Sequence, residues 1–271
     1  MMDLDWFDPS PEVVIRPEVN CRRVWQRRFG KEYIQISSTV ILANEGGRIF
    51  ELICKELDSI ASPVYDYRDA GYVYYEYDAP KSGPVTVFRA PEPGPWAAAL
   101  LEELIASGGR QFLLMNRTGS LRATVPVGSL VLPDELVREE GTSYHYAPPD
   151  VRLTTSRQLN QRIRDIASGL GIPLIDGKHW TTDAIYRETF AKVERLAGAG
   201  VVSVDMELSA LAGVAYFRKC ELSAVLVVSD VVARDHSWNG MTTPEFGLGV
   251  QRAAQIASRV FRFEESQSVS H

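Results

Sequence analysis

Short apolar runs alternate with segments of helical periodicity along most of the 271 residues of this chain. Runs of about four to eight apolar residues between turn-forming residues are typical of buried strands, whereas apolar residues at every third or fourth position indicate helices. We expect strands over 38–43, 72–77, 85–89, 112–115, 129–132, 172–175, 201–204 and 224–229. We expect helices over 20–29, 48–57, 96–107, 156–169, 188–197, 207–217 and 244–263. This alternation predicts the α/β class with a largely parallel sheet.

The composition fits one globular domain and excludes several classes of protein. Because 45% of the residues are hydrophobic and no linker interrupts the pattern, we expect one domain over 37–264, with an N-terminal arm over 1–36 and a polar tail over 265–271. The net charge of −6 argues against a nucleic-acid partner. No apolar run approaches the roughly 18 residues of a membrane span, so we expect no membrane association.

The cysteines and histidines show neither disulfide nor metal-ligand spacing. Cys21, Cys54 and Cys220 are far apart and form no CxxC motif, and the acidic N-terminus has no signal-peptide core. These features indicate a reduced, cytoplasmic compartment. We therefore expect no metal site and no cofactor, and a chemistry that ordinary side chains carry.

Carboxylates stand at the ends of two successive strand-like runs. Asp205 and Glu207 follow the run at 201–204, and Asp230 follows Ser229 at the end of the run at 224–229. One helix and one strand separate the two groups, so both can reach the same edge of a parallel sheet. Two acids in one cleft suggest one that stays charged and one that carries a proton.

Several motifs follow one another in an order that adds specificity to each. They are Gly94-Pro95 before a helical segment, Thr118-Gly119-Ser120-Leu121 after a strand, Glu140-Gly141-Thr142-Ser143-Tyr144-His145-Tyr146, Trp180-Thr181-Thr182-Asp183-Ala184-Ile185-Tyr186-Arg187-Glu188-Thr189, Asp205-Met206-Glu207 and Ser229-Asp230. From about Thr39 to Asp230 the chain thereby resembles the nucleoside phosphorylase superfamily, which includes bacterial purine nucleoside and uridine phosphorylases. The resemblance implies a single α/β catalytic domain, 37–264, with a mixed, strongly curved, barrel-like sheet flanked by helices. It also implies a homo-oligomer, either a dimer or a trimer of dimers.

The resemblance implies cleavage of a nucleoside's N-glycosidic bond and assigns roles to the acids. Glu207 would accept hydrogen bonds from the ribose hydroxyls, and Met206 would pack under the ribose. Asp230 would be the general acid that protonates a purine leaving group, with Ser229 orienting it. Asp205 would be either a further substrate contact or a helix cap.

Trp180 stands where the purine enzymes place an aromatic residue that stacks on the base. The glutamine and arginine with which uridine enzymes read uracil have Thr189 and Ala191 as their nearest counterparts, which favours a purine-type base. His145 lies in a loop that would line either the pocket or an interface.

The two phosphate loops depart from the family pattern. The first reads Asn44-Glu45-Gly46-Gly47-Arg48, so Arg48 is kept but Asn44 replaces a glycine. The second reads Leu114-Met115-Asn116-Arg117-Thr118-Gly119. There the expected arginine, glycine and hydroxyl residue fall on Leu114, Asn116 and Arg117.

Three hypotheses follow from the altered loops. The first is phosphorolysis of a purine-type nucleoside, with phosphate as co-substrate held by Arg48, Arg117, Asn44, Thr118 and Gly119. The second is a phosphate-independent nucleosidase or a specialised pathway enzyme. The third is a nucleoside-binding protein without catalysis.

Overall fold

The computed structural model describes residues 6–44, 48–78, 82–233 and 240–262. The strands are β1 (Thr39–Asn44), β2 (Ala61–Tyr67), β3 (Tyr72–Tyr77), β4 (Val85–Ala90), β5 (Gln111–Ser120), β6 (Leu130–Glu139), β7 (Ile175–Thr182), β8 (Val201–Asp205) and β9 (Glu221–Val231). The α-helices are α1 (Pro17–Phe29), α2 (Ile49–Asp58), α3 (Gly94–Ala106), α4 (Arg157–Gly169), α5 (Phe190–Gly198), α6 (Leu208–Arg218) and α7 (Pro244–Val260). Short 3-10 helices span Arg68–Ala70, Thr142–His145 and Ile185–Arg187. Within the described ranges, no helix combines the length and the apolar character needed to cross a membrane. The expected polar tail, 265–271, lies outside them.

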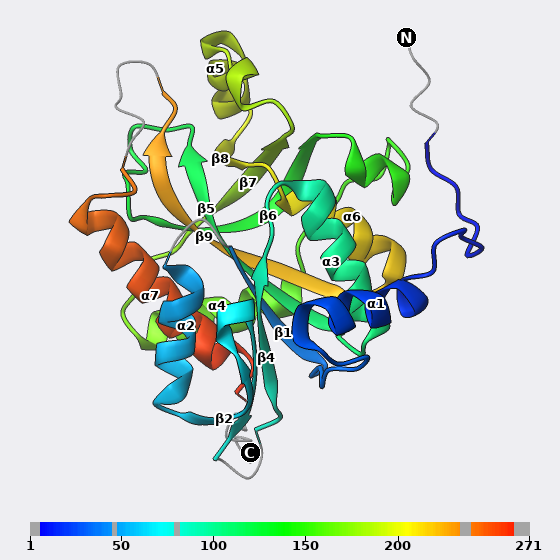
Figure 1. The fold of residues 1–271 in the computed structure, drawn as a ribbon. Coiled ribbons are helices and arrows are strands. Elements are labelled where there is room, and N and C mark those ends of the chain that lie inside the picture. The colour runs from blue at the N-terminus through cyan, green and yellow to red at the C-terminus, as the bar shows by residue number, and fades with distance from the viewer. Residues whose placement is uncertain (1–5, 45–47, 79–81, 234–239, 263–271) are drawn as a thin grey trace, which may run out of the picture.

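The strands form one sheet that closes on itself at one end. Their order is β2-β3-β4-β1-β5-β8-β7-β6-β9, and β9 also pairs with β5, which closes a barrel of five strands (Figure 1). The pairs β1–β4, β1–β5, β5–β9, β6–β7 and β7–β8 are parallel, and the other four pairs are antiparallel. The expected mixed, strongly curved sheet in a single α/β domain is confirmed, and the longest ladders, β5–β9 and β6–β7, are parallel, as the alternation of strands and helices predicted.

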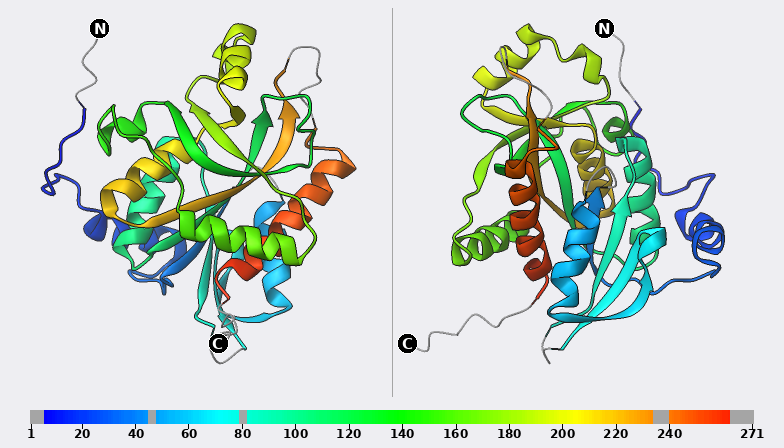
Figure 2. Two further views of the ribbon diagram at one scale, coloured as in Figure 1. Left: turned by 180° about the vertical axis from the view of Figure 1, so that it is seen from behind. Right: turned by 60° about the vertical axis from the view of Figure 1, so that its left-hand side comes forward.

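Helices cover the sheet from both sides (Figure 2). Apolar residues of α1, α3 and α6 share one core with one face of the strands, and those of α2, α4 and α7 share a second core with the other face. Cys21, Trp25 and Phe29 of α1 are buried in the first core, so this part of the expected N-terminal arm packs as an integral layer of the domain.

The sequence prediction missed β2 and misplaced β7, for different physical reasons, whereas β5 and β6 were found but are longer than predicted. The edge strand β2 was missed because most of its residues are exposed and it contains Pro63, so it shows no apolar run. β7 begins at Ile175, where the predicted strand at 172–175 ends, and its buried half is polar. His179 and Thr181 are buried there with hydrogen-bond partners in β8, which hydrophobicity alone cannot reveal.

The middle of β5 lies where the open sheet and the barrel diverge. Residues 111–115 pair with β1 on one side and β9 on the other, and residues 119–120 pair with β8 and β9. Among the described strands, residues 116–118 pair with β9 alone. Side chains at such a divergence have room to project into a crevice, as they do at the switch points of open α/β sheets.

Candidate active site

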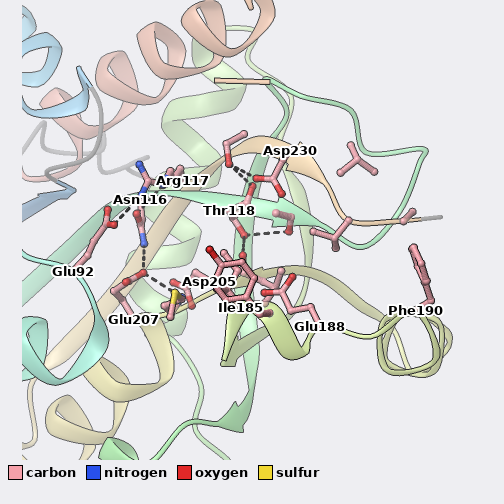
Figure 3. A pocket seen from close by; sticks show the side chains of 18 residues that line it. Glu92, Asn116, Arg117, Thr118, Ile185, Glu188, Phe190, Asp205, Glu207 and Asp230 are labelled. Carbon is pink, nitrogen blue, oxygen red and sulfur yellow. Dashed lines mark hydrogen bonds and ion pairs between the residues drawn. The ribbon is translucent and has the colours of Figure 1, made fainter. Parts of the chain in front are cut away.

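A cavity of about 460 Å³ opens beside residues 116–118 of β5 (Figure 3). Its walls come from β5, from β8 and the turn into α6, from the end of β9, and from the segment between β7 and α5. They are lined by Glu92, Asn116, Arg117, Thr118, Gly119, Ile185, Tyr186, Glu188, Phe190, Val204, Asp205, Met206, Glu207, Ser229, Asp230, Val231, Val232 and Ala233. A space of this size suits a small organic molecule.

Glu207 lies at one end of the cavity and is held by β5. Its Oε2 accepts a hydrogen bond from Asn116 Nδ2 at 2.8 Å, and both side chains are buried. Burial and, to a lesser extent, the neighbouring Asp205 raise the pKa of Glu207 to about 8, although the bond from Asn116 acts in the opposite sense. A ligand that donates hydrogen bonds to this carboxylate would therefore favour its charged form.

Asp205 caps the start of α6 and is also part of the cavity wall. Its carboxylate accepts from the Leu208 backbone N–H at 3.1 Å and from the Thr181 hydroxyl at 2.8 Å. His179 Nε2 lies 2.9 Å from Asp205 Oδ1 without hydrogen-bond geometry, while Nδ1 bonds Ser203 Oγ at 2.8 Å. The capping role anticipated for Asp205 is thus present together with exposure to the cavity.

Asp230 lies across β5 from the Glu207 side. Gly119 pairs with Val204 of β8 on one side and with Asp230 of β9 on the other, so β5 separates the two acidic groups. The Ser229 hydroxyl donates to Asp230 Oδ1 at 2.6 Å. Burial raises the pKa of Asp230, and Ser229 and Arg117 counteract that rise. A side chain at Gly119 would meet Asp230 Oδ2 at 3.1 Å, so glycine allows this close approach.

A further acid, Glu188, lies near Asp230 in the segment before α5. Burial, together with the charge of Asp230, raises the pKa of Glu188 to about 7. Beside it, Ile185, Tyr186 and Phe190 line the cavity although about half or more of each side chain is exposed. Apolar and aromatic side chains of this kind can pack against a flat heterocycle.

Arg117 is tied to a carboxylate that belongs to the cavity wall itself. Its Nη2 donates to Glu92 Oε2 at 2.8 Å. Glu92 lies just before α3, and this segment is fixed against the Glu207 turn because the Gly94 N–H donates to the Met206 carbonyl at 3.0 Å. A Cβ at Gly94 would meet that carbonyl at 2.7 Å.

Eight of the twelve residues predicted for the site line this cavity. They are Asp205, Met206, Glu207, Ser229, Asp230, Arg117, Thr118 and Gly119. Thr118 turns its hydroxyl away from the open space, because Oγ1 donates to the Val204 carbonyl at 2.7 Å. Within the described ranges, no group of three or more His, Cys, Asp or Glu residues is arranged to hold a metal ion.

Trp180 does not line the cavity, so the stacking role predicted for it has no geometric basis here. The side chain is fully buried in a small core with Leu121 and Val193, and its Nε1 donates to Glu139 Oε2 at 2.9 Å. A wholly buried ring offers no face to a ligand, so this tryptophan has a packing role.

Two other predicted residues, His145 and Arg48, also lie apart from the cavity, and the position of a third, Asn44, is described for its backbone alone. His145 stacks on Trp6 with ring centroids 5.3 Å apart, beside a separate hollow of about 340 Å³. Arg48 is exposed just before α2 and is not among the lining residues. The backbone of Asn44 pairs with Ala90, and its side chain lies outside the described part of the chain.

Sequence reasoning missed Glu92 and Glu188 as members of the site and treated Asn116 only as a lost glycine. Glu92 stands between Pro91 and Pro93, which gives no strand or helix periodicity to interpret. The sequence signal that could have identified Asn116 as a site residue is its position beside Arg117 at the end of an apolar strand.

The fold and this cavity define an α/β protein in which an open sheet continues into a five-stranded barrel. The acidic side chains of the cavity lie where the open sheet and the barrel meet. The family model of the phosphorylase superfamily matches residues 40–262. The chain therefore belongs to that superfamily.

Similar proteins include members that are named for different bases. The chain is 26% identical over 196 residues to the uridine phosphorylase of Thermococcus kodakarensis, an alignment that covers 67% of this chain and 68% of that protein. It is 28% identical over 130 residues to a DeoD-type purine nucleoside phosphorylase of Brevibacillus brevis, covering 47% of this chain and 55% of the relative.

Solved structures show the same fold. The purine nucleoside phosphorylase of Toxoplasma gondii superposes with a TM-score of 0.71 at 19% identity, covering 83% of this chain and 90% of that one. The uridine phosphorylase of Vibrio fischeri superposes with a TM-score of 0.68 at 18% identity, covering 84% and 92%.

Proposed function

We propose that this protein is an enzyme of the pentosyltransferase type that breaks the N-glycosidic bond of a purine-type nucleoside. The observation that supports it best is that two carboxylates on either side of β5 are each held by a hydrogen bond. Glu207 accepts from Asn116, and Asp230 accepts from Ser229. Membership of the phosphorylase superfamily supports the same reaction class.

In this proposal Glu207 holds the sugar. Its ionised carboxylate accepts hydrogen bonds from two ribose hydroxyls, and its charge stabilises the positive charge that develops on the sugar as the bond breaks. Since burial keeps the pKa of the unliganded group at about 8, binding the sugar releases a proton from Glu207 near neutral pH.

Asp230 supplies the proton to the departing base. Its raised pKa favours the protonated carboxyl, which can donate to a ring nitrogen of a purine. Ile185, Tyr186 and Phe190 line the same cavity as Asp230 and Glu188, and in this proposal they contact the base.

The test is base release from a panel of purine nucleosides and uridine, with the full chain and with Asp230→Asn. We expect purine nucleosides to be cleaved, and we expect the variant to lose roughly 10²- to 10⁴-fold in kcat while nucleoside affinity stays within severalfold. Asp176→Asn is the matched control, because Asp176 is a half-exposed acid paired with Arg164 at 2.6 Å outside the cavity. Full turnover by Asp230→Asn would remove the acid assignment, and preferential cleavage of uridine would remove the purine assignment.

A further inference from the structure

Behind the Glu207 end of the cavity, β7 and β8 bury a small group of polar side chains. His179 and Thr181 of β7 pair in register with Ser203 and Asp205 of β8, and all four residues are buried. Of the four, Asp205 alone lines the cavity, and in Figure 3 it lies beside Glu207. A change in the polar layer behind the wall can therefore reach the cavity through Asp205.

The imidazole of His179 bridges Ser203 and Asp205. Nδ1 and the Ser203 hydroxyl form a hydrogen bond at 2.8 Å, and Nε2 lies 2.9 Å from Asp205 Oδ1. Among the described residues Nε2 has no hydrogen-bond partner, so its contact with the carboxylate is electrostatic. A lone pair on Nε2 would be repelled by the carboxylate oxygen at this distance, so we infer that Nε2 carries a proton. The ring thus presents positive charge to Asp205.

The charge of Asp205 bears directly on Glu207. Asp205 raises the pKa of the Glu207 carboxyl, and Glu92 acts in the same sense. The guanidinium of Arg117 bonds Glu92, and within the described ranges no lysine or arginine forms an ion pair with Asp205. His179 is therefore the basic side chain of the described structure that lies against this carboxylate.

The other elements packed around His179 add an apolar residue and a second acid. β6 places Leu136 beside His179 in the strand pairing. From α6, the Ser209 N–H donates to the Thr181 hydroxyl at 3.0 Å, and the Ser209 hydroxyl donates to the buried Glu140 at 2.8 Å. These neighbours supply no positive charge, so the offset of the Asp205 charge falls to the imidazole.

Given the proposed cleavage of a nucleoside, on which this inference rests, we propose that His179 is a positioning residue of the sugar site. It fixes Asp205 from β7 and offsets the charge of that carboxylate, so that Glu207 can ionise when it accepts hydrogen bonds from the ribose. His179 does not line the cavity, so it acts on the substrate through Asp205 and Glu207.

The test is the pH profile of kcat/KM for base release by the unmodified protein and by His179→Leu, which has no ring N–H. We expect the acidic limb, which reports ionisation of Glu207 in the free enzyme, to move upward by about one pH unit. The reason is that an Asp205 charge without its offset opposes a second negative charge nearby. Above the shifted limb, kcat/KM should return to within severalfold of the unmodified value. A loss that is equal at every pH would show a structural role only and would overturn the inference.

Two further variants sharpen this test. His179→Gln keeps an N–H donor and should restore most of the original profile. Asn160→Leu is the matched control, because Asn160 is a buried polar residue that bonds Thr155 and Ser223 outside the cavity. It should lower stability and leave the acidic limb in place. The same shift in Asn160→Leu as in His179→Leu would overturn the assignment.

The unmodified protein gives a measurement that does not depend on how the variants fold. The nitrogen NMR signals of the His179 ring should show a proton on Nε2, both with and without bound nucleoside, and an unprotonated Nε2 would overturn the inference. Base release with an unshifted limb in His179→Leu would overturn this inference and leave the proposed function intact. No base release from any nucleoside would overturn the proposed function, and this inference with it.

Discussion

The cavity has two acidic walls that hold their carboxylates in different ways. The Asp230 wall consists of Ser229 and Asp230 on β9, and the Glu207 wall consists of Asn116 on β5 and Glu207 before α6. Asp230 accepts a hydrogen bond from the hydroxyl of its own neighbour, Ser229, so both partners lie on β9. Glu207 is bonded by Asn116, which lies 91 positions earlier in the chain on β5. A local partner lets an acid keep or lose its proton without disturbing the fold, whereas a distant partner makes one carboxylate a structural link between β5 and the start of α6. We therefore expect the Asp230 wall to carry proton transfer and the Glu207 wall to carry both substrate binding and stability.

Among the variants that distinguish the two walls, we expect Glu207→Ala to have the largest effect on kcat/KM. Loss of two charge-assisted bonds to the sugar, each worth roughly 1.5–3 kcal/mol, should lower kcat/KM by about 10²- to 10⁴-fold and weaken nucleoside binding. Asp230→Asn should leave binding nearly unchanged, so calorimetric titration of both variants compares the walls directly. Glu135→Ala, which removes a partner of Lys178 outside the cavity, serves as the control. Equal affinities of the two site variants would contradict the division of roles.

The pH dependence of stability should also distinguish the Glu207 wall. Between the ordinary pKa of 4.5 and the folded-state value of about 8, the unfolded chain ionises Glu207 while the folded chain keeps it protonated. Stability is therefore fully present below pH 4.5 and is lost as pH rises toward 8. Glu207→Gln should remove this loss, which amounts to roughly 5 kcal/mol between the two limits.

Urea unfolding of the unmodified chain and of Glu207→Gln across this pH range measures that difference. Glu188, whose pKa of about 7 contributes with the same sign, is present in both proteins and cancels in the comparison. Parallel stability curves would show that Glu207 is not the group responsible.

A smaller effect, confined to the Asp230 wall, is expected from Gly119→Ala. The new methyl group would lie 3.1 Å from Asp230 Oδ2 and 3.2 Å from Val204 Cγ1, so the acid must shift by a few tenths of an ångström. We expect a loss on the order of tenfold in kcat, because proton transfer depends on the position of the acid. Affinity for the nucleoside should change little, and a selective loss of affinity would argue that Gly119 contacts the substrate instead.

The smallest effect on the site is expected from Trp180→Phe, which changes neither wall. The variant loses the bond from Nε1 to Glu139 and should be destabilised by about 1–2 kcal/mol. Nucleoside affinity should stay the same, whereas Phe190→Ala should weaken it because that ring lines the cavity. Thermal unfolding and ligand titration of both variants make the comparison, and weaker binding by Trp180→Phe alone would restore its role at the base.

The difference between the walls also explains what sequence reasoning could and could not find. Ser229 and Asp230 are consecutive at the end of an apolar strand, so their partnership is visible in the sequence itself. Asn116 and Glu207 meet only because β8 crosses beside the end of β5, and Glu92 reaches Arg117 only because Gly94 docks on Met206. Such contacts depend on tertiary packing, which local periodicity does not encode. For the same reason Trp180, which matches a family motif, was placed at the ligand although β7 carries it into a core.

The strand pairing of β5 also determines where substitutions can alter the cavity. Residues 111–115 and 119–120 are fixed by neighbouring strands on both sides, while residues 116–118 between them pair on one side only among the strands that the structure describes. The backbone path through these three positions is thus set by anchors at either end, and all three residues line the cavity. Substitutions at these three positions can therefore change which groups line the cavity without requiring a new fold.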